Sequence, residues 1–238
     1  MIVAVHQPNY LPYLGFFHKM FLADVFVLYD TAQFSKNDFH NRNRIKTPKG
    51  LMWLTIPVRR PTGLEIRAVE ADTSKPWTRN HWEAIRANYA RAEHFEEHRQ
   101  GMERLYGDPG RQLVEINRRF IDFLSRTLGV ERRIVWASDL HVPEGLSASE
   151  KLAAIVREVG GDAYLSGPDG ARYVELDAFV GLAVYLQEFR LPRYRQLWGE
   201  FASNASALDL VLNLGEEAAS LLPECGAARP FPRTGTTG

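Results

Sequence analysis

The sequence contains very little cysteine and no long hydrophobic segment. Cys225 is its only cysteine, so an internal disulfide and a cysteine-based metal cluster are both excluded, and a reducing compartment is expected. No stretch approaches the roughly 18 uninterrupted apolar residues that a membrane-spanning helix needs. The N-terminus lacks a basic segment, and its apolar run ends at His6, which is unlike a signal peptide. We therefore expect a cytoplasmic protein with no membrane span.

The chain also lacks an excess of charge of either sign. Lys and Arg together number 29, as do Asp and Glu, so no net field attracts a nucleic-acid backbone or an anionic membrane. The sequence has no Gly-x-Gly-x-x-Gly motif and no P-loop, and its seven His residues include no His-Glu-x-x-His. We expect no cofactor and no metal ion, and nucleic acid is a disfavoured partner. Nothing in the sequence indicates an oligomeric state.

What is present is the composition of a folded protein. The 238 residues are 45% hydrophobic and 24% charged, which fits one large domain or two small ones. Residues 1–5 form a β-branched run, residues 14–22 have apolar side chains at helical spacing, and residues 24–30 are an apolar run bounded by acids. A strand, a helix and a strand within about thirty residues predict a βαβ unit with a right-handed crossover.

Helical and strand patterns alternate again towards the C-terminus. We predict an α/β fold, with a mostly parallel, Rossmann-like sheet flanked by helices, as a single domain over residues 1–225. A helical insertion of three helices is expected at about 75–130, and a frayed tail rich in Pro, Gly and Thr over 226–238. Other expected elements are a loop at 31–50, paired strands at 52–58 and 64–71, strands at 133–137, 163–166 and 183–189, and helices at 147–159, 175–181, 205–214 and 216–222.

The first candidate site is the polar segment that follows the first predicted strand. Open α/β sheets bind ligands outside the carboxyl ends of their strands, and His6 there precedes a helix N-terminus, whose free N–H groups favour anions. The alternative is a polar turn that only satisfies backbone groups. Nucleotidyl-transfer enzymes also have a strand, a loop with His and Gly, and a helix, but their His-x-Gly-His signature is absent. The candidates are His6 as catalytic acid/base and Gln7, Asn9 and Tyr10 as substrate-binding residues.

A second candidate site is the basic, aperiodic segment at 33–46. Arginine binds phosphate or carboxylate with a bidentate fork, and asparagine adds neutral donors and acceptors. Basic residues interleaved with Phe34 and Phe39 also suit stacking on nucleic-acid bases, while a solvated loop that binds nothing is the third interpretation. The balanced net charge favours a small anionic ligand. The candidate binding residues are Lys36, Asn41, Arg42, Asn43, Arg44 and Lys46.

Three further candidates follow later predicted elements. Ser166 and Gly167 end a strand at the same sheet edge as His6, where a glycine permits close approach of a ligand. A plain strand-to-helix turn would contain the same residues. Tyr173 follows shortly after, and Tyr194 is an aromatic residue near a turn that can line a pocket or belong to the core.

Two carboxylates also stand out. Asp30 ends the second strand and is a candidate catalytic residue that orients His6 or shares its proton. Asp209 lies within an apolar predicted helix, and a buried carboxylate needs a polar partner, which the basic segment could supply.

Several of these strings resemble the WbqC-like protein family. The resemblance covers nearly the whole chain, and it implies a role in bacterial O-antigen and cell-surface polysaccharide biosynthesis without supplying a list of catalytic residues. Two departures are Tyr13, where the family often has Trp, and residues 169–172, which replace a Gly-Gly-Lys-Asn-like stretch. The matching strings are residues 6–17, 24–27, 33–37, 41–46, 81–82, 164–167, 209–210 and 213–215.

From the residues and the resemblance we predict a cytoplasmic transferase acting on a small anionic or activated-sugar substrate. Its pathway would be cell-surface polysaccharide (O-antigen, lipopolysaccharide) or related small-metabolite biosynthesis, with acyl or aminoacyl transfer to an amino sugar as one option. Two alternatives remain open. One is a non-catalytic module that binds a nucleotide-sugar or a partner protein, and the other is nucleotidyl transfer.

Overall fold

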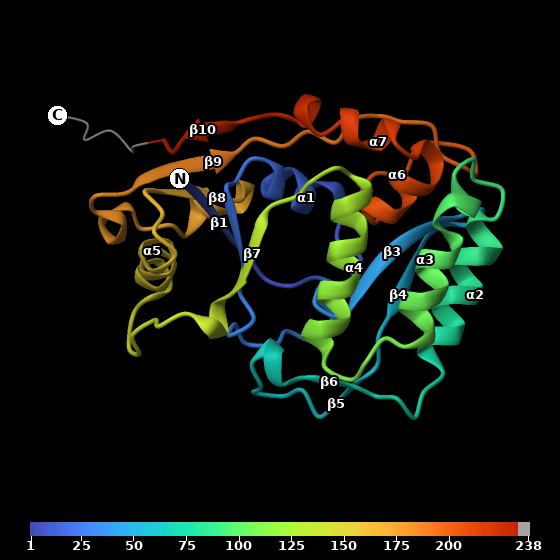
Figure 1. Ribbon diagram of the computed structural model, residues 1–238, viewed down its shortest axis with the longest axis horizontal. Coiled ribbons are helices and arrows are strands. Elements are labelled where there is room, and N and C mark those ends of the chain that lie inside the picture. The colour runs from blue at the N-terminus through green and yellow to red at the C-terminus, as the bar shows by residue number, and fades with distance from the viewer. Residues whose placement is uncertain (233–238) are drawn as a thin grey trace.

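A six-stranded mixed sheet organises the chain, as the computed structural model shows for residues 1–232 (Figure 1). The strand order is β10-β9-β8-β1-β2-β7. All neighbouring pairs are parallel except β10 and β9. The predicted α/β fold with a mostly parallel sheet is therefore confirmed. The strands are β1 (Ile2–His6), β2 (Val25–Leu28), β7 (Arg133–Trp136), β8 (Ala163–Ser166), β9 (Ala183–Gln187) and β10 (Ala228–Pro230).

The two faces of this sheet are covered by different helices. Side chains alternate along a strand, so Val3 and Val5 of β1 pack with the helix α5 (Ala148–Glu158), whereas Ala4 packs with the helix α1 (Leu14–Phe21). A capping box begins α5, since Ser147 and Glu150 each accept a hydrogen bond from the other's backbone N–H. The sheet is thus the middle layer of three.

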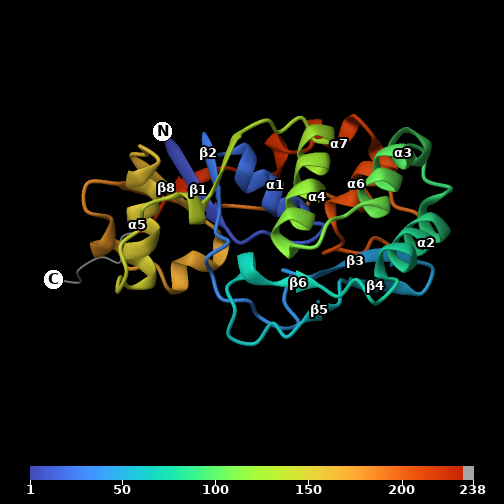
Figure 2. The same cartoon turned by 60° about the horizontal axis from the view of Figure 1, so that its bottom comes forward.

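The remaining helices lie mainly to one side of the main sheet. In Figures 1 and 2, α5 lies at one end of the molecule and α2 and α3 at the other, with the main sheet and α4 between them. The three predicted central helices are present, while their status as an inserted unit stays a prediction. The helices are α2 (Trp77–Tyr89), α3 (Phe95–Gly107), α4 (Leu113–Thr127), α6 (Ala207–Leu214) and α7 (Glu217–Ser220).

The predicted loop at 31–50 is wrong in its second half. Residues there form β3 (Arg42–Thr47), which pairs with β4 (Gly50–Thr55) in an antiparallel hairpin. The buried side of β3 includes Asn43 as well as Ile45. The sequence of this strand therefore does not show the alternation of hydrophobic and polar residues that usually identifies a strand. The predicted pairing of 52–58 with 64–71 is also wrong for most of its length, because only β5 (Val58–Arg59) and β6 (Glu70–Ala71) pair.

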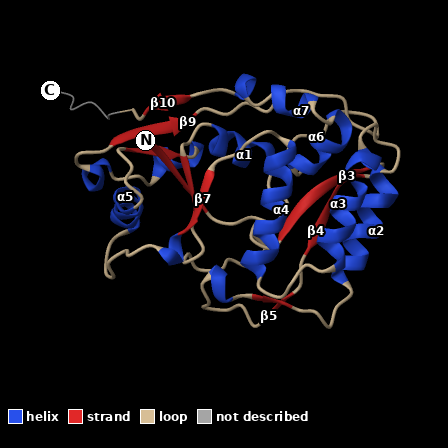
Figure 3. Ribbon diagram, in the orientation of Figure 1, coloured by secondary structure: helices blue, strands red, loops and turns tan. Residues whose placement is uncertain are grey.

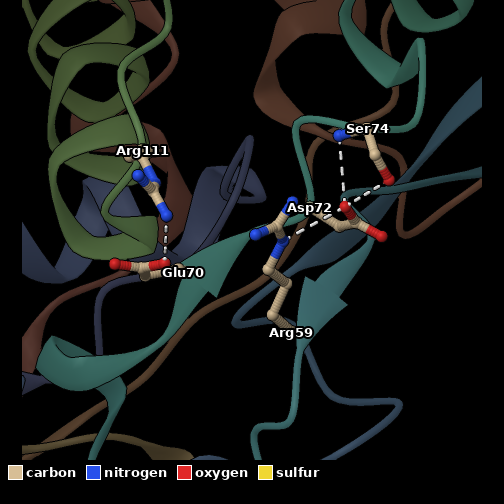
Figure 4. A network of polar contacts seen from close by, with 5 residues as sticks. All are labelled: Arg59, Glu70, Asp72, Ser74 and Arg111. Carbon is tan, nitrogen blue, oxygen red and sulfur yellow. Dashed lines mark hydrogen bonds and ion pairs between the residues drawn. The ribbon is translucent and has the colours of Figure 1, made fainter.

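Solvent-accessible ion pairs connect the segments around β5 and β6. Arg111 lies 2.9 Å from Glu70, and Asp72 accepts from Arg59 at 3.3 Å and from the Ser74 hydroxyl at 2.6 Å; Figure 4 shows how these side chains lie. Ion pairs that water can reach contribute little to stability. This network therefore links neighbouring segments without adding much to the free energy of unfolding.

The chain after α5 is rich in irregular structure (Figure 3). The predicted helix at 175–181 is a short 3₁₀ turn, and the predicted frayed tail contains β10, whose pairing with β9 covers that strand's free edge. Residues 233–238 of that tail lie outside the described part. The 3₁₀ turns are η1 (Ile66–Ala68), η2 (Ala137–Asp139), η3 (Pro168–Arg172), η4 (Leu176–Phe179) and η5 (Pro223–Cys225).

Candidate functional site

A cavity of about 380 Å³ opens at the carboxyl ends of the central strands. β1 is flanked by β2, which follows it in the chain, and by β8, which comes much later. The chain therefore leaves β1 on one side and returns on the other, which creates the kind of crevice where open α/β sheets bind ligands. The volume suits a small molecule. Its polar lining includes His6, Gln7, Lys19 and Gln187.

Lys19 brings a buried amine into this cavity from α1. Its side chain is only 4% exposed, and its Nζ donates to the backbone carbonyl of Val5 at 2.8 Å. Burial lowers the pKa of Lys19 to about 7. That carbonyl is the one acceptor it contacts among residues 1–232, whereas an ammonium has three N–H donors. The remaining donors suit an anionic group of a ligand.

His6 lies beside Lys19 as a neutral imidazole. Its Nδ1 is 2.9 Å from the Gln7 carbonyl, which only accepts, so Nδ1 carries the proton and Nε2 keeps a free lone pair. Burial and, next, the charge of Lys19 lower the pKa of His6 to about 3. The ring edge packs on Phe16 at 4.8 Å between centroids. At neutral pH His6 can accept a hydrogen bond or a proton, but it cannot act as a cation that binds an anion.

Gln7 is connected to a second buried histidine, His40. The Gln7 Oε1 atom lies 2.9 Å from the Nε2 of His40, and the His40 Nδ1 accepts from the backbone N–H of Ser35 at 3.2 Å. Burial lowers the pKa of His40. The side chain of Gln7 thus lines the cavity while its oxygen is held from behind.

Four tyrosines complete the wall of the cavity. Burial raises the pKa of Tyr13 and of Tyr173, and the charge of nearby Asp169 adds to both shifts, so these phenols stay protonated. Rings that also carry hydroxyl groups suit the faces and hydroxyls of a sugar. The other two tyrosines of the lining are Tyr29 and Tyr164.

The structure brings four of the predicted residues together. His6, Gln7, Gly167 and Tyr173 all line the cavity, although they come from two distant parts of the chain. Ser166 lies next to them, fully buried at the end of β8.

The predicted basic residues lie outside this lining. The guanidinium groups of Arg42 and Arg44 stack over Trp53 of the hairpin at 4.2 and 5.0 Å, and Arg42 also donates to the Asn37 carbonyl. The buried Lys46 Nζ donates to the Glu200 carbonyl at 2.6 Å. Lys36 is exposed.

The predicted asparagines and Tyr10 are buried, and those with hydrogen bonds bind groups of the protein itself. Asn41 donates to the Ile56 carbonyl, and Asn43 donates to the Leu11 carbonyl, each at 2.7 Å. Leu11 has a φ of 43°, a strained value for a branched residue, so Asn43 stabilises that turn. The Tyr10 hydroxyl is buried against His81 and Tyr106. Asn9 is buried as well.

The two predicted carboxylates have partners elsewhere. Both oxygens of Asp30 accept from Ser138, from its N–H at 3.0 Å and its hydroxyl at 2.6 Å. The hydrogen bond that orients His6 therefore comes from Gln7 and not from Asp30. Asp209 accepts from Tyr194, Tyr89 and Gln196, each at 2.7 Å. These groups are its hydrogen-bond partners, while the charge of Lys46, in the predicted basic segment, also acts on Asp209 and lowers its pKa against the larger rise caused by burial.

Sequence reasoning did not select Lys19, His40, Gln187 or Asp169 as site residues. A lysine within an otherwise apolar helical run was a usable indication for Lys19, because such a charge is rarely buried without a reason. His40 and Asp169 lie in segments that the sequence did single out, and Gln187 ends a predicted strand, but no local pattern distinguishes these three residues from their neighbours.

Residues 1–232 contain neither a helix that could span a membrane nor a cluster of side chains that could hold a metal ion. No helix there is long and apolar enough to cross a membrane. In the same part of the chain, no three side chains of His, Cys, Asp and Glu gather in a way that could hold a metal ion.

Comparisons with known proteins agree with the resemblance seen in the sequence. The model of the WbqC-like protein family matches residues 7–221. The chain is also 35% identical over 229 residues to the uncharacterized protein Rv1507c of Mycobacterium tuberculosis, which covers 94% of this chain and 98% of that protein. No solved structure shows significant similarity. The match to the family model spans most of the sequence, and this chain belongs to the WbqC-like protein family.

Proposed function

We propose that the protein is a cytoplasmic transferase that binds a small, anionic, activated metabolite of cell-surface polysaccharide biosynthesis in the cavity beside β1. The observation that carries this proposal is Lys19, a buried amine with one backbone acceptor in a cavity at the sheet's crossover point. Membership of the WbqC-like family supports the class of pathway. Four tyrosines in the wall support a sugar or a similar hydroxylated group.

In this proposal the residues divide the chemistry of a group transfer. Lys19 binds the carboxylate or phosphate of the activated donor. His6 accepts the proton of the attacking amine or hydroxyl at Nε2, where its lone pair is free. The new bond forms to the transferred acyl group, the bond to the leaving group breaks, and His6 returns the proton to that leaving group. An anion bound at Lys19 would offset the charge that lowers the pKa of His6, which makes His6 a better base in the complex.

A second candidate is a binding module that holds the same metabolite without changing it. The observation that favours it is the pKa of about 3 at His6, because a general base works best when its pKa is near the working pH. The two functions differ in one measurement. The module predicts saturable binding without any product, whatever acceptor is supplied.

The test is to compare Lys19→Met with Lys49→Met, which removes an exposed lysine of the hairpin turn. Melting temperatures are measured with nucleoside triphosphates, nucleotide-sugars, acyl-CoA and amino acids. A ligand at ~100 times its Kd adds about 2.7 kcal/mol of stability. We expect one class to stabilise the wild type and Lys49→Met but not Lys19→Met. An equal shift in Lys19→Met would overturn the role of Lys19, and no shift with any class would overturn the small-metabolite site.

The same variant reports whether the fold survives. Methionine has a similar length but no amine to desolvate, so Lys19→Met should be more stable than the wild type without ligand, by roughly 1–3 kcal/mol at neutral pH. Chemical denaturation measures this difference. A large loss of stability instead would show that the lysine is a structural requirement.

A further inference from the structure

We infer that His40 is a positioning residue that holds the Gln7 side-chain amide with its NH₂ group towards the cavity, so that the site selects a ligand oxygen that accepts hydrogen bonds. This inference rests on the proposed function only in using the same cavity as the ligand site. His40 does not line that cavity and acts through Gln7.

The first step is the position of the proton on His40. The backbone N–H of Ser35 points at Nδ1 at 3.2 Å. A backbone amide can only donate, so Nδ1 must hold a lone pair. The single proton of the neutral ring then sits on Nε2. Burial, which lowers the pKa of His40, keeps the ring in this neutral form.

The second step is the orientation of the amide. The Nε2–H of His40 faces the end of Gln7 at 2.9 Å. If the amide were flipped, its NH₂ group would meet another N–H, and two donors repel. The oxygen of Gln7 therefore faces His40, and the NH₂ group, with no acceptor among residues 1–232, faces the cavity that Gln7 lines.

The third step is the rigidity of the support behind Gln7. His40 is 1% exposed, and its carbonyl accepts from the Asn117 side chain of α4 at 2.7 Å. The same Asn117 amide donates to the Pro8 carbonyl at 2.9 Å. Asn117 of α4 thus links the backbone next to Gln7 with the backbone of His40. This link fixes the positions of the two side chains relative to each other.

These steps describe the ligand atoms that the site prefers. The NH₂ group of Gln7 and the amine of Lys19 are donors, and the free Nε2 of His6 is an acceptor. A ligand that fits places a carboxylate, phosphate or carbonyl oxygen at Gln7 and an N–H or O–H group at His6. A bare hydroxyl can also accept from Gln7, but it would lack the added strength that a charged acceptor brings.

The first experiment needs no ligand. Nitrogen-15 NMR of the full chain at neutral pH distinguishes a protonated from an unprotonated ring nitrogen in His40. We expect Nε2 to carry the proton and Nδ1 to be bare. A proton on Nδ1, or a doubly protonated ring, would overturn the inference, whatever is found for Lys19.

The second experiment is a double-mutant cycle with inorganic phosphate as the probe. Gln7→Met should weaken phosphate binding about 10- to 100-fold, the range for a hydrogen bond to a charged group. His40→Leu should weaken it in the wild type and add nothing in the Gln7→Met background. His40→Gln, whose amide can still donate to Gln7, should restore binding, and His141→Leu at an exposed histidine is the control.

The outcomes separate the inference from the proposed function. Additive losses in the cycle, or no loss in Gln7→Met, would show that His40 has a merely structural role and would overturn the inference. If the wild type binds no phosphate at all, the anion site at Lys19 is overturned, and the NMR measurement alone decides the orientation of Gln7.

Discussion

At the residue scale, backbone groups set the state of three polar side chains of the cavity, namely Lys19, His6 and, through His40, Gln7. The carbonyl of Val5 holds Lys19, the carbonyl of Gln7 holds His6, and the N–H of Ser35 acts on Gln7 through His40. Backbone groups cannot change between donor and acceptor. The cavity therefore presents a fixed arrangement of hydrogen-bond donors and one acceptor before any ligand binds.

Two glycines at this edge of the sheet differ in the room that they leave. A methyl group on Gly170 would lie 1.6 Å from the Oγ of the fully buried Ser166, whereas one on Gly167 would meet only the Lys19 Nζ at 3.9 Å. Gly170→Ala should therefore lower stability by about 1–3 kcal/mol, as overpacking does, while Gly167→Ala changes it little. Urea denaturation of the two variants measures this. Equal stability would mean that Ser166 moves aside freely.

At the element scale, Asp209 joins segments that no strand pairing connects. It belongs to α6 and accepts from Tyr89 at the end of α2 and from Tyr194 and Gln196 in the irregular segment after β9. The Tyr89 hydroxyl in turn accepts from the backbone N–H of Lys46 in β3. A helix, a hairpin and a loop are thereby held at one buried carboxylate, which is 0% exposed.

Removing that carboxylate should leave the hydroxyls of Tyr89 and Tyr194 without an acceptor, whereas Gln196 keeps the Ala202 carbonyl. Asp209→Ala is expected to cost roughly 3 kcal/mol or more, because each unsatisfied buried group carries its desolvation penalty. Thermal unfolding would show this as a marked fall in Tm, with Asp139→Ala, at an exposed aspartate, as the matched control. A fall no larger than that of the control would contradict the role given to Asp209.

The elements also differ in how well the sequence predicts them. α1, β2 and α4 have an amphipathic stripe or a continuous apolar run, so their patterns identify them. β3 is not identifiable in this way, because Asn43 on its buried side pairs with backbone carbonyls and Arg42 and Arg44 pack on Trp53 on the other side. Polar residues with tertiary partners do not produce a hydrophobic period.

At the scale of the whole molecule, two histidines with lowered pKa values, the half-buried His6 and the buried His81, make stability depend on pH. Burial, as the main cause, lowers the pKa of His6 to about 3 and of His81 to about 4, while both would titrate near 6.5 in the unfolded chain. As the pH falls below about 6.5, the unfolded chain therefore takes up protons that the folded chain does not. The stabilisation is complete above that pH and is lost progressively as the pH falls towards 4 and 3.

Between about pH 7 and about pH 5, each histidine should cost roughly 2 kcal/mol of stability. His81 binds the Tyr10 hydroxyl and the Thr55 carbonyl, and glutamine can replace both contacts without titrating. His81→Gln should therefore lose about 2 kcal/mol less than the wild type over this range when urea denaturation is measured at both pH values. Identical losses in the two proteins would contradict the assignment to His81.

The sequence by itself determined the α/β class, the βαβ unit at the N-terminus and the polar segment at the end of the first strand. These features are local, since they depend on the spacing of apolar residues and on the residues that follow a strand. It also carried the resemblance to the WbqC-like family, which the comparison with the family model confirms.

Only the tertiary structure decided which polar residues face one cavity. Lys19 and Gly167 meet there because β8 pairs with β1, and a pairing between distant segments leaves no periodicity in the sequence. The basic residues of β3 belong to a separate two-stranded sheet and lie outside the lining of the cavity. The packing of the whole core determines the strand order, and the strand order determines which residues line the cavity.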